Sequence, residues 1–284
     1  MPIDLSQALG AEIPGDEVTW SEDDVILYHL GLGCGSPPTD PRELAYTYEG
    51  RLKVLPTWGV IPVHRMLGRV PEIPGLDFNP VLLLHGEQEL EILKPIPTSA
   101  TVTNRGRVAD IFDKQKAALV VFETESKDAS GETLFINRFS MFMRGEGGFG
   151  GSGGPKAGNH PPDREPDLVV ETQTLPQQAL IYRLSGDKNP LHADPDFAKA
   201  AGFERPILHG LCTYGIVCRA VVDHLLDGDT TRVARYKVRF RGVVLPGETI
   251  VTSMWNEGDR VFLRATNKEQ ETTVLSNAVM VLRE

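Results

Sequence analysis

The fold is decided by the stretch Leu208-His-Gly-Leu-Cys-Thr-Tyr-Gly-Ile-Val-Cys-Arg-Ala-Val-Val-Asp-His-Leu-Leu226. Apolar side chains recur in it at spacings of three and four, as in Leu211, Tyr214, Val217 and Val221, which predicts a helix. They also spread well around that helix, and a helix that is apolar on most sides has to be buried. An antiparallel sheet wrapped around it is one of the few ways to cover it in so short a chain, so we expect an α+β fold.

Strands are predicted in both halves of the chain. Alternating apolar residues indicate two strands near the end of each half, at 118–124 and 135–143 and then at 260–266 and 273–282. A turn opens a further strand in each half, in Leu93-Lys-Pro-Ile-Pro-Thr and in Val243-Val-Leu-Pro-Gly-Glu. Each half is therefore expected to be a helical start followed by a series of antiparallel strands.

The two halves are related by an internal repeat. Tyr28 lies 154 positions before Tyr182 in similar surroundings, and the same offset places Asp40-Pro41 on Asp194-Pro195. The first half has no equal of the long helix, because Gly68, Pro71 and Pro74 interrupt the segment that follows Pro62. The central helix of the first repeat should be short or missing.

A linker separates the repeats. The run Gly145-Glu-Gly-Gly-Phe-Gly-Gly-Ser-Gly-Gly-Pro155 and the polar, proline-rich residues after it have no apolar period. We expect an N-terminal repeat over residues 1–144, a linker over 145–167 and a C-terminal repeat over 168–284, each repeat being of ordinary domain size.

Composition excludes several function classes. The chain has 40% apolar and 24% charged residues, which is ordinary for a globular protein, and no apolar run long enough for a membrane span. A net charge of −10 argues against a nucleic-acid partner. The N-terminus lacks the pattern of a signal peptide, so we expect a cytoplasmic protein with no membrane partner. Cys34, Cys212 and Cys218 match no zinc or redox spacing and are expected to be buried free thiols.

A candidate site lies in Tyr182-Arg-Leu-Ser-Gly-Asp-Lys-Asn-Pro-Leu-His192, where a proline is expected to stop a helix. Asp187, Asn189 and His192 supply a carboxylate, an amide and an imidazole, which can position and deprotonate a water. Alternatively, Asp187 and Asn189 only shape a turn and His192 is a surface imidazole. The repeat argues against this alternative, because the equivalent positions of the first half have lost every polar group: they are Gly33, Gly35 and Pro38.

These residues resemble the signature of the MaoC-like, type 2 (R-specific) enoyl-CoA hydratases. The resemblance rests on Tyr182, Ser185-Gly186-Asp187, Asn189-Pro190, Leu191-His192, Ala198 and Gly210, and the order of the repeats is similar to the long members over nearly the whole chain. It implies a tandem (double) hot-dog fold, with an antiparallel sheet around a central helix in each repeat and a degenerate N-terminal repeat. It implies hydration of trans-2-enoyl-CoA to (3R)-3-hydroxyacyl-CoA, in β-oxidation of fatty acids or sterol side chains, with no metal or redox cofactor.

The resemblance also implies catalytic roles. Asp187 and His192 match the pair that holds and activates the water, and Asn189 matches the amide that helps to orient it. Gly210 would offer its N–H to the thioester oxygen, since a helix N-terminus favours negative charge and glycine permits close approach. The simpler interpretation of Gly210 is a tight entry into the helix, and for His209 a structural role is favoured.

Substrate contacts are implied at two further places. The basic segment 235–241 resembles the family's segment near the CoA phosphates and adenine, with Arg239, Arg241, Phe240 and Gly247 as candidates; a solvated edge strand is the alternative. The acyl chain is expected in the space left by the degenerate first repeat. His85 and Gly86, in the turn 84–87, are candidates for contact with it, unless this turn only connects strands.

Other functions stay open at this level. A dehydratase acting in reverse on acyl carrier protein substrates would need the same residues, whereas a hot-dog thioesterase lacks this Asp-Asn-His run. From another class, the chain could be a non-catalytic acyl-CoA binding module, against which the retained polar residues argue. A tandem repeat is already a pseudo-dimer, and the resemblance implies that two chains associate as a homodimer.

Overall fold

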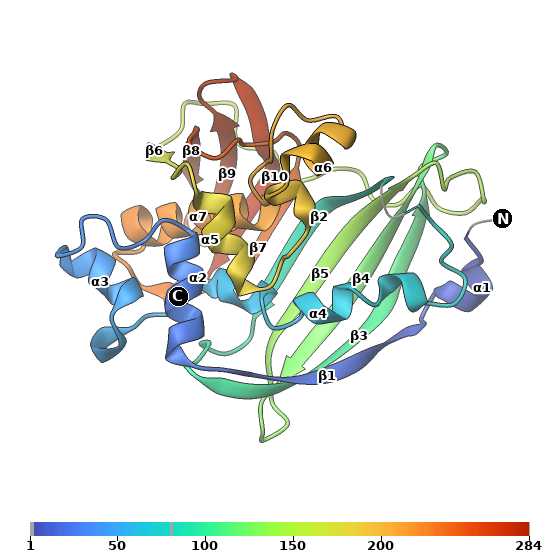
Figure 1. The fold of residues 1–284 in the computed structure, drawn as a ribbon, viewed down its shortest axis with the longest axis horizontal. Helices are drawn as coiled ribbons and strands as arrows, with labels where there is room; N and C mark the ends of the chain where they lie inside the picture. The colour runs from blue at the N-terminus through green and yellow to red at the C-terminus, as the bar shows by residue number, and fades with distance from the viewer. Residues whose placement is uncertain (1–2, 80–81, 284) are drawn as a thin grey trace.

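The computed structural model describes residues 3–79 and 82–283. Within them the strands form one ten-stranded sheet in the order β1-β3-β4-β5-β2-β7-β10-β9-β8-β6, and every neighbouring pair is antiparallel (Figure 1). The strands of the first half are β1 (Glu12–Trp20), β2 (Leu83–Ile92), β3 (Ala100–Asp113), β4 (Ala117–Lys127) and β5 (Thr133–Arg144). Those of the second half are β6 (Leu168–Gln173), β7 (Val233–Phe240), β8 (Thr249–Asn256), β9 (Arg260–Asn267) and β10 (Thr272–Leu282).

The sheet is symmetric about the pairing of β2 with β7. Read inward from either edge, β1 corresponds to β6, β3 to β8, β4 to β9, β5 to β10 and β2 to β7. This is the tandem hot-dog arrangement that the sequence led us to expect. The strands predicted near the end of each half are confirmed, but β1 and β6, which precede the helical starts, were not predicted.

The predicted buried helix is α7 (Gly210–Leu225), and most of its residues are buried. It packs against β6 and β8 of its own half and against η2 (Pro56–Val60) of the first half. Burial of each large apolar side chain, such as Ile216 or Val221, stabilises the fold by roughly 1.5–3 kcal/mol. Cys212 and Cys218 on this helix are buried free thiols, as is Cys34, which confirms the expectation for the cysteines.

The first half holds only short helical segments at the corresponding place. After η2 come α4 (His64–Leu67) and η3 (Val70–Glu72), and α4 lies in front of β4 and β5 (Figure 1). Gly68 ends α4 and Pro71 lies within η3, so a continuous helix is not formed. The prediction of a short or missing central helix is confirmed.

The helical starts of the two repeats pack against each other. In the first repeat α2 (Glu22–Gly31) is followed by α3 (Pro41–Thr47); in the second, α5 (Gln178–Tyr182) and η5 (Arg183–Ser185) are followed by η6 (Pro190–His192) and α6 (Pro195–Ala200). Asp40 and Asp194 cap α3 and α6 in the same way, each before a proline. Tyr28 and Tyr182 meet where α2 contacts α5, with ring centroids 5.9 Å apart. The other helices of the described residues are α1 (Leu5–Ala8), η1 (Glu49–Arg51) and η7 (Thr230–Arg232).

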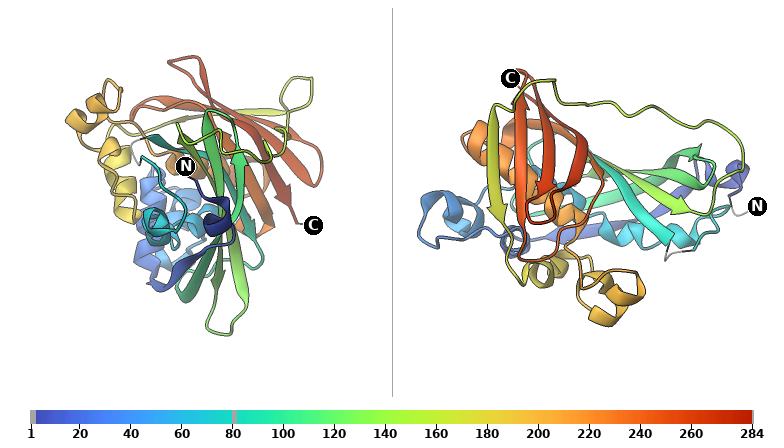
Figure 2. Two further views of the ribbon diagram at one scale, coloured as in Figure 1. Left: turned by 90° about the vertical axis from the view of Figure 1, so that its right-hand side faces the viewer. Right: turned by 90° about the horizontal axis from the view of Figure 1, so that it is seen from above.

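Residues 145–167 carry no helix or strand and run along one side of the molecule between the two halves (Figure 2, right). Hydrogen bonds hold this segment. The Asp113 carboxylate accepts the N–H groups of Gly148 and Gly150, and the Asn277 amide donates to the Gly158 carbonyl. None of the helices in the described ranges has the length and apolar content needed to cross a membrane.

Candidate active site

The segment that carries the catalytic candidates leaves its helix at a glycine. The helical run ends at Ser185, and Gly186 has φ +139°, a conformation that side chains other than glycine rarely adopt. The sequence suggested that Pro190 stops this helix, and this is wrong. Pro190 is the first residue of the next helical segment, η6. Asn189 caps η6, because its side-chain oxygen accepts the Leu191 N–H at 3.0 Å. Its backbone N–H donates to Asp187 Oδ1 at 3.1 Å.

Asp187 and His192 are brought together as predicted. A carboxylate oxygen of Asp187 and one ring nitrogen each of His192 and His209 lie within 4.8 Å of one another. One water that makes two hydrogen bonds of ~2.8 Å at a tetrahedral angle joins acceptors that are about 4.6 Å apart. Since no two of these atoms are farther apart than 4.8 Å, the carboxylate and the imidazole are close enough to share one water.

The surroundings of His192 define its tautomer. Its Nδ1 lies 2.8 Å from the Ile207 carbonyl oxygen, which can only accept, so Nδ1 carries the proton and Nε2 has the lone pair of the neutral ring. Burial lowers the pKa of His192, against the opposing effects of the Ile207 bond and the Asp187 charge. His192 is thus a neutral imidazole whose Nε2 can accept a proton.

Asp187 is held as a carboxylate. Burial raises its pKa, but His64, His209 and the Asn189 N–H favour the charged form by more, and together they hold the pKa of Asp187 below its usual range. His64 Nε2 lies 3.6 Å from Asp187 Oδ2. His64 belongs to α4 of the first repeat, so both repeats contribute to the site.

His209 supports the other two groups. Its Nε2 donates to the Asp187 carbonyl oxygen at 3.3 Å, and its ring stacks on that of His192 with a centroid distance of 3.7 Å. Burial lowers the pKa of His209 to about 3, so it is neutral. Asp187, His192 and His209 could also be considered as metal ligands, but His192 Nδ1 already donates to the Ile207 carbonyl and His209 Nε2 to the Asp187 carbonyl. The arrangement suits proton transfer better.

Sequence reasoning missed His64 and favoured a structural role for His209. Nothing in the spacing marks His64, because it lies in the interrupted segment of the first half, far along the chain from Asp187. For His209, its position next to the catalytic candidate Gly210 could have indicated that it lies in the site.

Gly210 begins α7 as predicted, and it is exposed although most of that helix is buried. A Cβ on Gly210 would lie 3.1 Å from Cε1 of Phe240, so the ring of Phe240 borders this helix end. The first N–H groups of a helix have no acceptor within it and form a partial positive charge. The helix end can therefore receive an anionic oxygen.

His85 and Gly86 lie within β2, at a bulge between His85 and Glu87, and the expected turn at 84–87 is wrong. The His85 ring lies 4.8 Å from that of Phe240, and burial lowers the pKa of His85 to about 4. His85, Gly86, Phe240, Arg239 and Arg241 all line one cavity of about 720 Å³. The structure thus groups five of the substrate-binding candidates.

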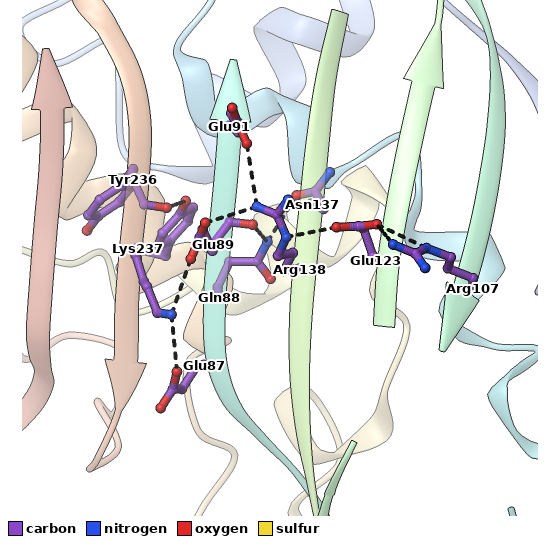
Figure 3. A network of polar contacts seen from close by, with 11 residues as sticks. Glu87, Gln88, Glu89, Glu91, Arg107, Glu123, Asn137, Arg138, Tyr236 and Lys237 are labelled. Carbon is purple, nitrogen blue, oxygen red and sulfur yellow. Dashed lines mark hydrogen bonds and ion pairs between the residues drawn. The ribbon is translucent and has the colours of Figure 1, made fainter. Parts of the chain in front are cut away.

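The basic strand is β7, which pairs on both sides and is not an edge strand. Acidic residues of β2 face it: Arg239 Nε donates to Glu87 at 2.8 Å, and Lys237 lies between Glu87 and Glu89 (Figure 3). Arg241 is exposed at the end of the strand, with Nε 3.4 Å from Ser276 Oγ. The charge of Arg239 is therefore compensated, whereas that of Arg241 faces solvent.

Gly247 lies apart from that cavity. It has φ +96°, and its N–H donates to Thr174 Oγ1 at 2.9 Å. Its neighbour Pro246 lines a second cavity, of about 180 Å³, together with His192 and Arg205. Arg205 is a basic residue near the candidate site that the sequence did not single out.

The equivalent positions of the first repeat form no such site. Gly33 and Gly35 adopt φ values of +85° and +94°, and the Gly35 N–H donates to Glu43 at 2.7 Å. Leu32 is buried there and fills the space beside Gly215 of α7. Neither a carboxylate nor an imidazole stands at the equivalent positions, and Pro38 is exposed.

Known families match both halves of the chain. A model described as the MFE-2 hydratase 2 N-terminal domain matches residues 18–145, and one described as a MaoC like domain matches residues 157–279. The chain is similar to "Enoyl-CoA hydratase ChsH3" of Mycobacterium tuberculosis, at 47% identity over 281 residues that cover 98% of each chain. It is also similar to "Enoyl-CoA hydratase 2, peroxisomal" of Arabidopsis thaliana, at 43% identity over 95% of this chain and 93% of that relative. A solved structure, a MaoC-like dehydratase from Phytophthora capsici, superposes with a TM-score of 0.90 at 32% identity and covers 99% of this chain and 98% of that one.

Proposed function

Since this chain belongs to the MaoC-like, type 2 enoyl-CoA hydratases, it is a hydro-lyase that adds water to enoyl-CoA, and we propose that Asp187 and His192 activate the water. The observation that carries the proposal is the spacing of these two groups, which suits one bridging water, with Asp187 charged and His192 neutral. Both can then accept hydrogen bonds from the same water.

The proposed reaction begins with attack of this water on C3 of a trans-2-enoyl-CoA. His192 Nε2 takes a proton from the water as the C3–O bond forms, and Asp187 holds the water and stabilises the imidazolium. The electron pair of the C2–C3 double bond moves toward the thioester, and the imidazolium then returns the proton to C2. The product is the 3-hydroxyacyl-CoA, which we propose to be the (3R) isomer. The chemistry draws on these side chains alone, without a metal or redox cofactor.

Negative charge develops on the thioester oxygen in this reaction. We assign the Gly210 N–H as its donor, because Gly210 is exposed at the N-terminus of a long buried helix. His209 holds the Asp187 backbone, and Asn189 acts through its N–H on the Asp187 carboxylate. A further role of the Asn189 side chain in orienting the water remains our proposal.

We assign the acyl chain and the CoA moiety of the substrate to two regions of the protein. The acyl chain is proposed to lie against the N-terminal repeat, residues 1–144, where only short helical segments cross the sheet, with His85 and Gly86 in contact with it. For CoA we propose the region of Arg239, Phe240, Arg241 and Gly247. Arg241 is the favoured phosphate ligand, because Arg239 is already paired with Glu87.

The test is to measure hydration of crotonyl-CoA, as loss of the conjugated enoyl absorbance, and the configuration of the product. Asp187→Asn keeps the size of the side chain but not its charge, and should lower kcat by roughly 10²- to 10⁴-fold with unchanged thermal unfolding. Asp196→Asn, on the exposed surface of α6, is the matched control and should behave as wild type. Full activity of Asp187→Asn would refute the proposed mechanism.

A dehydratase on acyl carrier protein substrates is the second candidate. It is favoured by the similarity to a solved MaoC-like dehydratase, and by the fact that one catalyst accelerates both directions. Comparing kcat/KM for crotonyl-CoA and for the carrier-protein ester separates the two. A higher value for the carrier-protein ester would favour the dehydratase.

We also propose a cytoplasmic location and a homodimer. Three buried free thiols are consistent with a reducing compartment. Five similar relatives carry peroxisomal names, so the location is tested by imaging a tagged chain in its own cell. The homodimer is tested by light scattering on the purified chain.

A further inference from the structure

His64 lies in the active site although it belongs to the first repeat. Its Nε2 is 3.6 Å from Asp187 Oδ2, which is within ion-pair distance. A Cβ built on Gly186 would lie 3.8 Å from the Cβ of His64, so the His64 side chain also borders the turn that carries Asp187. The contact therefore joins a catalytic side chain to the other half of the molecule.

The backbone that carries His64 is fixed. Val63 and Met66, on either side of it, are almost completely buried. The buried Asn104 of β3 donates from Nδ2 to the Pro62 carbonyl at 3.0 Å, and Asn104 Oδ1 accepts from Ser126 at 2.7 Å. A side chain on such a support can orient a neighbour with little loss of conformational entropy.

The second ring nitrogen of His64 points to function rather than to packing. Nδ1 is buried and has no hydrogen-bond partner among the described residues. Leaving a buried polar atom unpaired costs about 1–3 kcal/mol. Packing alone gives no reason to keep a histidine here.

We propose that His64 is a positioning residue of the second repeat's active site, where it orients the Asp187 carboxylate toward the reacting water. The proposal rests on the proposed function of Asp187. If His64 has this role, the degenerate first repeat takes part in catalysis as well as accommodating the acyl chain.

The proposal has a consequence for pH dependence. Burial raises the pKa of Asp187, and His64 is the largest influence that opposes this. Without His64, the pKa values of Asp187 and His192 should both rise, because His64 lowers each of them, and the acid limb of activity, which the titration of His192 sets, should move to higher pH. The other groups that face Asp187 or its neighbours stay in place: Arg183 on η5, His192 on η6, His209 before α7 and His85 on β2.

The experiment compares His64→Ala, His64→Gln and wild type with crotonyl-CoA over the pH range in which each remains folded. His64→Ala should lower kcat by roughly 10- to 100-fold, the loss typical of groups that orient a reacting ligand, and should leave KM nearly unchanged. His64→Gln keeps a polar N–H group beside the carboxylate but has no group that can take up a proton, so it should recover most of kcat while its acid limb stays shifted. His224→Ala, on the exposed surface of α7, is the matched control.

The outcomes separate the two proposals. If wild type does not hydrate crotonyl-CoA, the proposed function fails whatever the variants do. If wild type is active and both His64 variants retain its kcat and its acid limb, the positioning role is wrong. If His64→Ala does not fold, His64→Gln decides: a shifted acid limb supports the role and an unchanged one overturns it.

Discussion

The Cα of Tyr182 lies so close to Gly31 that a Cβ on Gly31 would be 3.0 Å from it. This approach joins the helical starts of the two repeats. Gly31→Ala should therefore destabilise the protein: overpacking against backbone costs roughly 1–3 kcal/mol, more than the gain of about 0.4–1 kcal/mol from a stiffer unfolded chain. Urea unfolding measures the difference. Gly158→Ala is the control, because a Cβ there meets no atom within 4 Å, and equal loss in both variants would contradict the packing argument.

Gly210 allows the oxyanion role to be tested with a matched pair. Proline is well tolerated at the first position of a helix, and His209 before it already has an extended ψ of 135°. Gly210→Pro should fold but lose the N–H, and kcat should fall by roughly 10²- to 10³-fold, as when an oxyanion donor is removed. Gly210→Ala brings the same Cβ against Phe240 but keeps the N–H, so it controls for crowding. Equal kcat in the two variants would assign the effect to crowding alone.

The pH profile of wild type tests the role of His192. The proposed base must be neutral, and burial lowers the pKa of His192 below its usual 6.5. Activity should therefore rise with pH, with a midpoint below pH 6.5. Measured kcat/KM from pH 5 to 9 gives the midpoint. A midpoint at or above 6.5, or an active His192→Gln variant, would be incompatible with this base.

His29 predicts loss of stability in acid. Its Nδ1 donates to the Tyr46 carbonyl at 2.8 Å and its Nε2 accepts the Leu55 N–H at 3.2 Å, which only the neutral ring can do. Burial lowers the pKa of His29 to about 4, so between pH 6.5 and 4 the unfolded chain binds more protons. As the pH is lowered through this range, the free energy of unfolding should decrease, by about 3 kcal/mol at most. Urea unfolding at pH 7 and 5 measures it, and His29→Gln should reduce the slope; His85 and His209 act in the same direction.

Arg241 tests the CoA assignment. Arg241→Ala should raise KM for enoyl-CoA about tenfold, the value of one hydrogen bond to a charged group. It should leave KM unchanged for an enoyl-pantetheine that lacks the nucleotide. Arg205→Ala is the informative comparison, because Arg205 lines the cavity beside His192. An effect of Arg205 alone would move the phosphate site to that cavity.

The sequence predicted those features that local pattern determines. The spacing of apolar residues located α7, and the repeat singled out Asp187 and His192. It could not predict features that depend on pairing between distant segments. Compensation of Arg239 by Glu87 follows from the register of β2 with β7, and the contact of His64 with Asp187 spans both repeats.

Smaller errors have local causes. Pro14 and Gly15 break the alternation of β1, and β6 has only six residues, so neither strand was predicted. Gly86 was interpreted as a turn residue but occupies a bulge, where a Cβ would lie 3.2 Å from the Ser140 carbonyl oxygen.

The segment 145–167 joins the two halves of the sheet in one polypeptide, encoded by one gene. In a dimer of identical subunits, each mutation would appear at both sites, and one site could not be lost while the other was kept. Covalent connection removes that constraint: Gly33, Gly35 and Pro38 could replace one set of polar groups while Asp187, Asn189 and His192 were retained in the other. His64 of the first half can then support the active site of the second half, although the first half has no active site of its own.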